Sequence, residues 1–495
     1  MGQMTRRAAL LAGGMLLGGF AGAKLTSKVP PIAGTKSLQP VGLGSSLNDA
    51  SLLNETPVAK HIVIQNNPGD GLISLVRNEI EIARRDGRPF NIGAARHSMG
   101  GHAIPANGNA VTFDSGFTEL DSAAGTYRVH AGARWSQVIA GLDPLGFGPK
   151  VMQSNNDFGV AATFCVNAHG WPVPHGPMGA TVRSIHIVRP DGEVVKCSRT
   201  ENAPLFFLTM GGYGLTGAII EMEVEAETNQ NLVPTYQEMP SREFAKFFQG
   251  AIESGDVNMA YGRLNVDRET FFEDALMITY RAADDQSETL PADGSGTLSR
   301  ISRHIFRAQL MNETAKNLRW WFETELSPMV GGGLATRNSL INEPVVTLDD
   351  NDPTRTDILH EYFVPPGRFP DFVDACQEVI PASFQEMMNI TLRYVAADPE
   401  SVLSYAPTAR IACVMLFSQE MTARAEADHV RMTRALIDRV LDLNGNYYLP
   451  YRPHATPSQF LRAYPRARAF AAEKREYDPD IVFRNGFWDN YLKVL

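Results

Sequence analysis

Residues 89–104 read PFNIGAARHSMGGHAI, and this stretch decides how the rest of the chain is interpreted. An apolar approach ending at Ile92 runs into a turn of small residues, 93–95, followed by Arg96-His97-Ser98. Small side chains allow backbone N–H groups to converge on an anion such as a pyrophosphate. A histidine inside such a turn then lies next to the part of the ligand that adjoins the anionic group. The alternative is a glycine-rich surface loop with an incidental histidine, so the remaining sequence has to decide.

Length and composition indicate a globular protein of more than one domain. The chain has 495 residues, of which 44% are hydrophobic and 20% charged, and a single core rarely grows to that size. Its net charge is −10, and no basic cluster is present. We therefore expect no nucleic-acid partner.

The first 23 residues are typical of an export signal. Two arginines, Arg6 and Arg7, precede an uncharged run from Ala8 to Phe20 and a small-x-small cleavage site at 21–23. This pattern indicates a twin-arginine signal and a periplasmic or secreted protein, a route that carries folded proteins with their cofactor already bound. The alternative is an uncleaved anchor, but the apolar run is short for a membrane span. We expect no stable membrane insertion after cleavage.

Cysteine usage excludes a disulfide framework. Four cysteines occur without CxxC spacing: Cys165, Cys197, Cys376 and Cys413. They are interpreted as buried apolar residues.

Hydrophobic periodicity predicts a mixed α+β fold in two main parts. In the first part we expect helices at 70–85 and 135–142, and strands at 61–64, 110–113, 127–132, 184–188, 193–195 and within 210–224. In the second we expect helices at 242–253, 313–326 and 422–442, strands at 259–265, 275–280, 358–364, 388–395 and 409–417, and loops at 284–298 and 330–337. Residues 153–181 form a long irregular segment, which is usually functional in a compact domain. The predicted domains are a signal at 1–23, an arm at 24–57, domains at 58–228 and 229–445, and a tail at 446–495 that packs back on the first domain.

Three motifs in order resemble the FAD-dependent oxidoreductases of the vanillyl-alcohol oxidase type, which carry a PCMH-type FAD-binding domain. The turn over 93–98 is similar to the family's pyrophosphate turn, which commonly ends in His-Ser. The segment 159–177 resembles its second FAD loop, and residues 190–193 with 211–220 resemble its closing hairpin and glycine turn. The resemblance implies a PCMH-type domain in two parts, joined to an α+β substrate domain.

The resemblance also implies residues that contact FAD. They are Gly93, Ala94, Ala95, Arg96, His97, Ser98, His102, Gly159, Ala162, Thr163, Cys165, His169, Gly170, Gly217 and Ile219. His97 matches the histidine that many members bond covalently to the flavin 8α-methyl group; His102 is the weaker candidate, and non-covalent FAD is the alternative. Some relatives add a cysteinyl bond, but Asn155 lies near the place of that cysteine and Cys165 lies beyond the motif. One covalent bond is therefore expected.

The substrate half resembles two branches of the family. Residues 360–365 and 389–394 are similar to paired strands of the alditol and aldonolactone oxidases, where a Glu-x-Arg pair points at the flavin. Arg393 is present here, while Thr391 stands in the place of the glutamate. Residues 448–450 and 477–479 also resemble the cytokinin dehydrogenases. We expect hydride removal from a CH–OH group of a small alcohol, polyol or lactone; the alternatives are CH–NH oxidation and a catalytically decayed flavin-binding protein.

Four side chains are candidates for the chemistry of hydride and proton transfer. Arg393 offers fixed positive charge for a developing alkoxide or for the reduced flavin, or it is a solvent-facing strand residue. Asp157, Glu361 and His454 are candidate proton acceptors. For Asp157 the alternative is a turn-forming role, and for Glu361 an exposed strand position. The electron acceptor is dioxygen, a quinone or a cytochrome.

A metal site is not expected. His169 and His175, taken with His97 and His102, match no ligand spacing, and the surrounding glycine and alanine suit close cofactor packing.

Overall fold

A computed structural model describes residues 36–42, 44–65, 70–114, 116–287, 292, 306–326, 328, 335–344 and 352–495. The predicted export signal, most of the first half of the arm and most of the predicted loop at 284–298 lie outside these residues. Within the described residues, no helix is both long and apolar enough to cross a membrane. The fold mixes helices with antiparallel and parallel sheets, as predicted.

A small parallel sheet carries the turn that opens the site. Its strand order is β3-β5-β4, with β3 at Lys60–Ile64, β4 at Phe90–Gly93 and β5 at Asn109–Phe113. Helix α2 (Asp70–Arg85) connects β3 to β4, and its apolar stripe, which includes Val76 and Ile80, is fully buried. Helix α2 and strands β3 and β5 confirm the elements predicted at 70–85, 61–64 and 110–113, whereas β4 was not predicted as a strand. Because β4 ends at Gly93, the sheet fixes where the glycine turn begins.

A second, antiparallel sheet follows in the order β10-β9-β11-β7-β6, and β8 pairs with β11. These strands span Thr118–Asp121 (β6), Thr126–His130 (β7), Phe147–Pro149 (β8), Val182–Val188 (β9), Val194–Ser198 (β10) and Ala218–Thr228 (β11). The accompanying helices are α3 (Trp135–Leu142), α4 (Val160–Cys165) and α5 (Ala203–Thr209). The hairpin of β9 and β10 confirms the prediction, whereas the supposedly irregular segment 153–181 contains α4.

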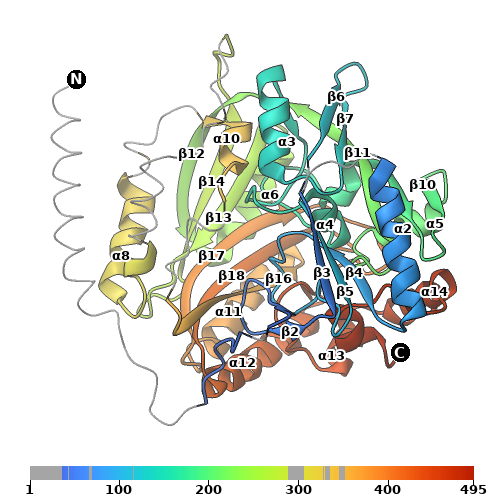
Figure 1. Ribbon diagram of the computed structural model, residues 1–495. Helices are drawn as coiled ribbons and strands as arrows, with labels where there is room; N and C mark the ends of the chain where they lie inside the picture. Colours follow the sequence, from blue (N-terminus) through green and yellow to red (C-terminus); the bar gives the residue numbers. More distant parts are fainter. Residues whose placement is uncertain are drawn as a thin grey trace.

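The largest element is an eight-stranded sheet in the order β15-β12-β14-β13-β17-β18-β16-β19 (Figure 1). Its strands span Asn231–Pro240 (β12), Val257–Leu264 (β13), Asp274–Ala282 (β14), Ala335–Thr336 (β15), Arg355–Val364 (β16), Glu386–Val395 (β17), Arg410–Glu420 (β18) and Asn446–Tyr447 (β19). Helices α6 (Phe244–Glu253), α11 (Phe369–Val379) and α12 (Ala423–Asp442) share a hydrophobic core with these strands. Helices α8 (Glu313–Trp321) and α10 (Arg337–Ile341) lie toward the β12 side in Figure 1.

Most predicted elements of this second part are confirmed, but β12 and α11 were missed. Pro234 and Pro240 lie within β12, and Pro370 lies at the start of α11. In a sequence, proline usually indicates a loop or a turn. It is also tolerated in the first turn of a helix and in strands at or near a sheet edge. The predicted loop at 330–337 is wrong at its end, where β15 and α10 begin.

The N-terminal arm and the C-terminal tail both return to the parallel sheet. Strands β1 (Ser46–Leu47) and β2 (Thr56–Pro57) form a small hairpin in the arm. The tail forms helices α13 (Pro457–Ala463) and α14 (Ala467–Tyr477) (Figure 1). Beyond α14, the Phe90 N–H donates to the Val482 carbonyl at 2.7 Å, so the tail extends the edge of β4.

One buried ion pair anchors this return of the tail. Lys474 and Asp478 form a salt bridge in which both side chains have at most 1% of their surface exposed. The Asp478 carboxylate also accepts from the Phe483 N–H at 2.8 Å. Burial lowers the pKa of Lys474, and the adjacent carboxylate opposes that shift.

We expect Asp478→Ala to lower the free energy of unfolding by roughly 3–5 kcal/mol, because it leaves the Lys474 charge buried without its partner. Chemical denaturation measures the change. Asp442→Ala, which removes an exposed pair with Arg462, serves as the control and should change stability far less. Equal losses in the two variants would contradict this account of the tail.

Candidate active site

A large cavity lies where the glycine turn, the α4 segment and the eight-stranded sheet meet. Its volume is about 1130 Å³. The sequence-predicted residues that line it are Gly93, Ala94, Ala95, Arg96, His97, Ser98, His102, Gly159, Ala162, Thr163, Cys165, His169, Gly217, Ile219, Glu361 and Arg393. Asp157, Gly170 and His454 are not part of the lining. The cavity therefore combines both predicted motif groups with the predicted substrate strands.

Hydrogen bonds from the arm and the tail hold the glycine turn in place. Arg96 adopts a left-handed φ of 54°, and its carbonyl accepts from the Ala50 N–H at 3.0 Å. The Met99 N–H donates to the Pro450 carbonyl at 2.8 Å. In the arm, the Asp49 carboxylate accepts from the Gly101 N–H at 2.7 Å. The arm is thus part of the site rather than a passive linker.

The basic groups beside this turn fit an anionic ligand. The Arg96 guanidinium donates to Thr112 Oγ1 at 2.7 Å, while its Nε is buried without a hydrogen-bond partner. Nη1 of the nearby Arg134 is likewise buried and unpartnered among the described residues. Burial and the Arg134 charge lower the pKa of Arg96 to about 10. Because buried donors normally have partners, Arg96, which lines the cavity, suits an anionic group such as the pyrophosphate of FAD.

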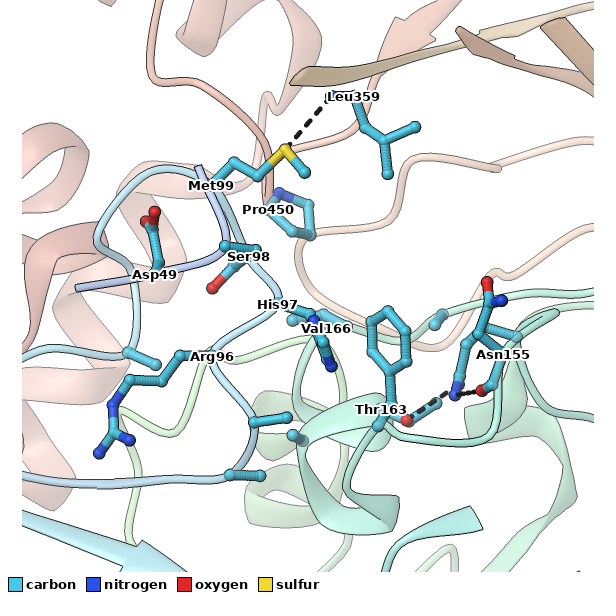
Figure 2. Close-up of a pocket in the computed structure, with 18 of the residues that line it drawn as sticks. Asp49, Arg96, His97, Ser98, Met99, Asn155, Thr163, Val166, Leu359 and Pro450 are labelled. Atoms are coloured by element: carbon cyan, nitrogen blue, oxygen red, sulfur yellow. Dashed lines mark hydrogen bonds between the residues drawn. The ribbon is translucent and has the colours of Figure 1, made fainter. Parts of the chain in front are cut away.

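The α4 segment forms the opposite wall of this part of the cavity. Thr163 Oγ1 accepts from the Trp135 indole N–H at 2.9 Å and bonds Gln153 Oε1 at 3.0 Å, which fixes the segment against α3. Figure 2 shows Thr163 opposite the turn that carries His97. A Cβ atom on Gly159 would lie 2.6 Å from Ala94 Cβ, so the two loops touch at a position that only glycine permits. Cys165 also lines the wall, and burial raises the pKa of its thiol to about 12.

His97 and His102 occupy different environments. His97 lies 3.2 Å from Asp157, measured from Nε2 to Oδ2, and its ring packs on Phe158 with the centroids 4.3 Å apart. His102 has only 2% of its surface exposed, and burial lowers its pKa to about 4. Its Nδ1 lies 3.2 Å from the Pro450 carbonyl. His102 thus packs within the wall, whereas His97 keeps a partly open side chain.

The sheet presents a polar row to the cavity. In the strand register Glu361 pairs with Val414, Val414 with Thr391, and Thr391 with Arg263. These residues therefore share one face of β16, β18, β17 and β13. Asn389 and Arg393 flank Thr391 at alternate positions and also line the cavity.

Glu361 is the buried carboxylate on the sheet face of the site, whereas Asp49 belongs to the arm. It contacts Nε2 of His169, and only 3% and 2% of the two side chains, His169 and Glu361, are exposed. The Tyr451 hydroxyl lies 3.4 Å from the second Glu361 oxygen. Arg393 Nη1 lies 3.5 Å from the His169 carbonyl, and the described part of the chain offers its buried Nε no hydrogen-bond partner. Burial lowers the pKa of Arg393, and the Glu361 charge opposes that shift.

Further polar and aromatic groups line the far end of the cavity. Arg263 Nη1 donates to Asn389 Oδ1 at 2.6 Å, and Asn389 Nδ2 donates to Thr391 Oγ1 at 3.3 Å. Trp171 stacks on Tyr261 with centroids 4.5 Å apart. Sequence reasoning missed Trp171, Tyr451, Arg263 and Asn389. Only Asn389 carried a signal, because it alternates with Thr391 and Arg393 on one strand.

Three residues that the sequence analysis placed at the site do not line the cavity. Gly170 packs against the Met152 carbonyl, where a side chain would overlap the backbone. Asp157 contacts His97 instead of lining the cavity. His454 lies behind the sheet, with Nε2 at 3.0 Å from Glu426 Oε1 and Nδ1 at 3.2 Å from Thr433 Oγ1. Burial lowers the pKa of His454. We therefore do not place His454 among the groups that face the substrate.

The remaining sequence predictions concern cysteines and metals. All four cysteines are free thiols, and Cys197, Cys376 and Cys413 are buried as predicted. In the part of the chain that the structure describes, no group of three or more His, Cys, Asp or Glu side chains is arranged to hold a metal ion.

Comparisons with known proteins agree with this site. Residues 73–198 match the model of the FAD binding domain. An alditol oxidase of a Streptomyces species is 30% identical over 155 residues, which cover 30% of this chain and 37% of that protein. Cytokinin dehydrogenase 1 of Oryza sativa subsp. japonica is 27% identical over 192 residues, 37% of this chain and 35% of that protein. A putative D-arabinono-1,4-lactone oxidase of Neurospora crassa is 28% identical over 107 residues, 22% of this chain and 19% of that protein.

Residues 73–198 are thus similar to the FAD binding domain. Over part of its length the chain is also similar to oxidases and dehydrogenases. The matched segments span about a third or less of the length of these relatives.

We expect Gly159→Ala to reduce the amount of FAD that purifies with the protein. The added methyl group pushes the α4 segment away from Ala94, and overpacking of about 1–3 kcal/mol corresponds to binding weaker by roughly 5-fold to 150-fold. The ratio of flavin to protein absorbance measures the effect. Gly250→Ala is the control, because its Cβ atom would meet nothing within 4 Å. Full flavin content in Gly159→Ala would show that the two loops do not need this close approach.

Proposed function

We propose that this chain is an FAD-dependent oxidoreductase that removes a hydride from a CH–OH group of a small alcohol, polyol or lactone. One observation carries the proposal. A buried carboxylate and a guanidinium, Glu361 and Arg393, line the same cavity as the loops that fit FAD. Oxidation of an alcohol needs a group that accepts the hydroxyl proton and positive charge that stabilises the developing alkoxide.

The lining favours a hydroxylated substrate. Thr391, Asn389 and Arg263 offer hydrogen-bond donors and acceptors along the sheet face. Trp171 adds an aromatic surface at the same end. A polyol or lactone presents several hydroxyl or carbonyl oxygens to such a surface, and each polar group in the wall then has a partner.

Each residue has a separate task in the proposed mechanism. FAD, when bound, supplies the hydride acceptor. Glu361 accepts the hydroxyl proton, and His169 and Tyr451 hold its carboxylate in position. Arg393 places positive charge beside the reacting oxygen, and its unpartnered Nε is available to donate. Burial of Glu361 and His169 excludes water from the carboxylate, which strengthens its electrostatic interactions.

The cofactor and its surroundings complete the proposal. His97 forms a single covalent bond to the flavin, a role supported by its place in the turn and by its partly open side chain. The twin-arginine pattern of the leader supports export of the folded, cofactor-loaded protein to the periplasm. Dioxygen, a quinone or a cytochrome would serve there as the electron acceptor.

Denatured, acid-precipitated protein should retain flavin fluorescence, and His97→Ala should lose it. The bond to the imidazole keeps the cofactor attached after unfolding, and the variant has no nucleophile at that position. His102→Ala is the control and should keep its fluorescence, because burial holds that ring within the wall. The opposite pattern would transfer the attachment to His102.

Glu361→Gln should lower the rate constant of flavin reduction by about 100-fold or more, because it removes the proton acceptor while preserving side-chain shape. The measurement is rapid mixing under anaerobic conditions, in which loss of flavin absorbance follows reduction by polyols, aldonolactones and amines. FAD content should stay unchanged. Glu119→Gln, an exposed carboxylate on β6, controls for the loss of charge. Unaltered reduction by a polyol in Glu361→Gln would remove Glu361 from the mechanism, and reduction by amines alone would favour CH–NH oxidation.

A further inference from the structure

Asp157 lies beside the site but has no task in the proposed oxidation. Its carboxylate is absent from the cavity lining and lies 3.2 Å from Nε2 of His97. The two side chains are 22% and 17% exposed, so they are partly shielded from water. This contact is local to the histidine and separate from Glu361, which faces the cavity from the sheet.

The backbone on both sides of Asp157 is firmly held. The Asn156 N–H donates to the Glu343 carbonyl at 3.0 Å, and its carbonyl accepts from the Ser136 N–H at 2.8 Å. The Phe158 carbonyl accepts from the Trp135 N–H at 3.1 Å. The carboxylate is therefore carried by a rigid segment attached to the start of α3.

The His97 ring is held from two further directions. Phe158 packs on the ring with centroids 4.3 Å apart and an interplanar angle of 35°. The turn itself is fixed by the hydrogen bond from Ala50 to Arg96 and by the hydrogen bond from Met99 to Pro450. Figure 2 shows the His97 side chain leaving this turn in a different direction from Arg96. Ring orientation thus depends on Asp157 and Phe158 together.

We propose that Asp157 is the positioning group and proton acceptor that enables His97 to bond covalently to the flavin. A neutral imidazole carries one proton, and the nitrogen without it is the nucleophile. A carboxylate next to Nε2 keeps the proton there, which leaves the lone pair of Nδ1 free to react. This inference rests on the proposed attachment through His97.

The bond-forming step balances with dioxygen as the oxidant. A bond forms between Nδ1 of His97 and the 8α carbon of the flavin, and one C–H bond of that methyl group breaks. The Nε2 proton passes to Asp157 and then to solvent. The two electrons released by oxidation of the methyl carbon reduce dioxygen, which takes up the two protons and leaves as hydrogen peroxide. The cofactor ends in its oxidised form, attached to the chain.

The experiment follows attachment itself rather than turnover. Apo-protein of the full chain is mixed with FAD in air, and samples are denatured at intervals and measured for flavin fluorescence in the protein band. Asp157→Ala and Asp157→Asn should attach FAD about 100-fold more slowly than the unaltered chain. Asp191→Asn, an exposed carboxylate in the β9–β10 turn, is the control and should attach at the normal rate.

Two further readouts separate proton acceptance from a merely structural role. Formate added to Asp157→Ala should restore much of the rate, because a free carboxylate can occupy the vacated space beside Nε2. In the unaltered chain, the flavin-bearing peptide should carry its bond at Nδ1. Titration of non-covalent FAD and thermal unfolding of Asp157→Asn, which preserves side-chain shape, verify that the variant folds and binds the cofactor.

The outcomes distinguish this inference from the proposed function. Attachment at the normal rate in either Asp157 variant, or a bond at Nε2 in the unaltered chain, overturns the role of Asp157 while His97 remains the tether. Absence of covalent flavin in the unaltered chain would show that His97 does not bond to the cofactor. The role proposed for Asp157 would then be wrong as well. Slow attachment that formate accelerates supports the proposal.

Discussion

The buried contact between His169 and Glu361 joins the two sides of the site, and the remaining geometry depends on it. His169 belongs to the segment after α4, whereas Glu361 lies on β16. A buried carboxylate is costly unless it is paired, so this contact favours one spacing between the cofactor loops and the sheet. Two tyrosine hydroxyls support the same spacing: Tyr405 donates to the Asn167 carbonyl at 2.6 Å, and Tyr448 donates to the Val166 carbonyl at 2.8 Å. These contacts together fix the distance between the cofactor loops and the sheet, which lie on opposite sides of the cavity.

Strand register decides which side chains face the cavity. A slip of one residue would turn Glu361, Thr391 or Arg263 to the opposite face, which packs against the helices. The register also bears on the glutamate that the sequence resemblance leads us to expect at position 391. Thr391 stands there instead, and Glu361 occupies the same cross-strand row two strands away. A carboxylate thereby reaches the cavity from β16 instead of β17.

Patterns among residues close together in the chain predicted many of the helices and strands. They also predicted the cofactor loops of the site, but not how these loops meet the sheet. The helices at 70–85 and 135–142 and the turn at 93–98 follow from residues close together in the chain, and the structure has α2, α3 and the turn in those places. The pairing of His169 with Glu361 joins residues 192 positions apart, and no local pattern carries that information. Proline also concealed a helix: Pro457 starts α13 behind a Thr456 cap, and the sequence analysis predicts no helix there.

Two histidine–carboxylate pairs flank the cavity, and their surroundings suit them to different chemistry. The pair of His169 and Glu361 is 3% and 2% exposed, whereas the pair of His97 and Asp157 is 17% and 22% exposed. The proton transfer proposed for Glu361 would recur in every catalytic cycle and would benefit from a water-excluded pair, because charges interact more strongly there. The proposed attachment of the flavin would happen once in the life of the protein, and it would release a proton that must reach solvent. The partly exposed pair of His97 and Asp157 gives that proton a path to solvent. The difference in burial therefore agrees with the proposed roles of the two pairs, one in catalysis and the other in attachment of the cofactor.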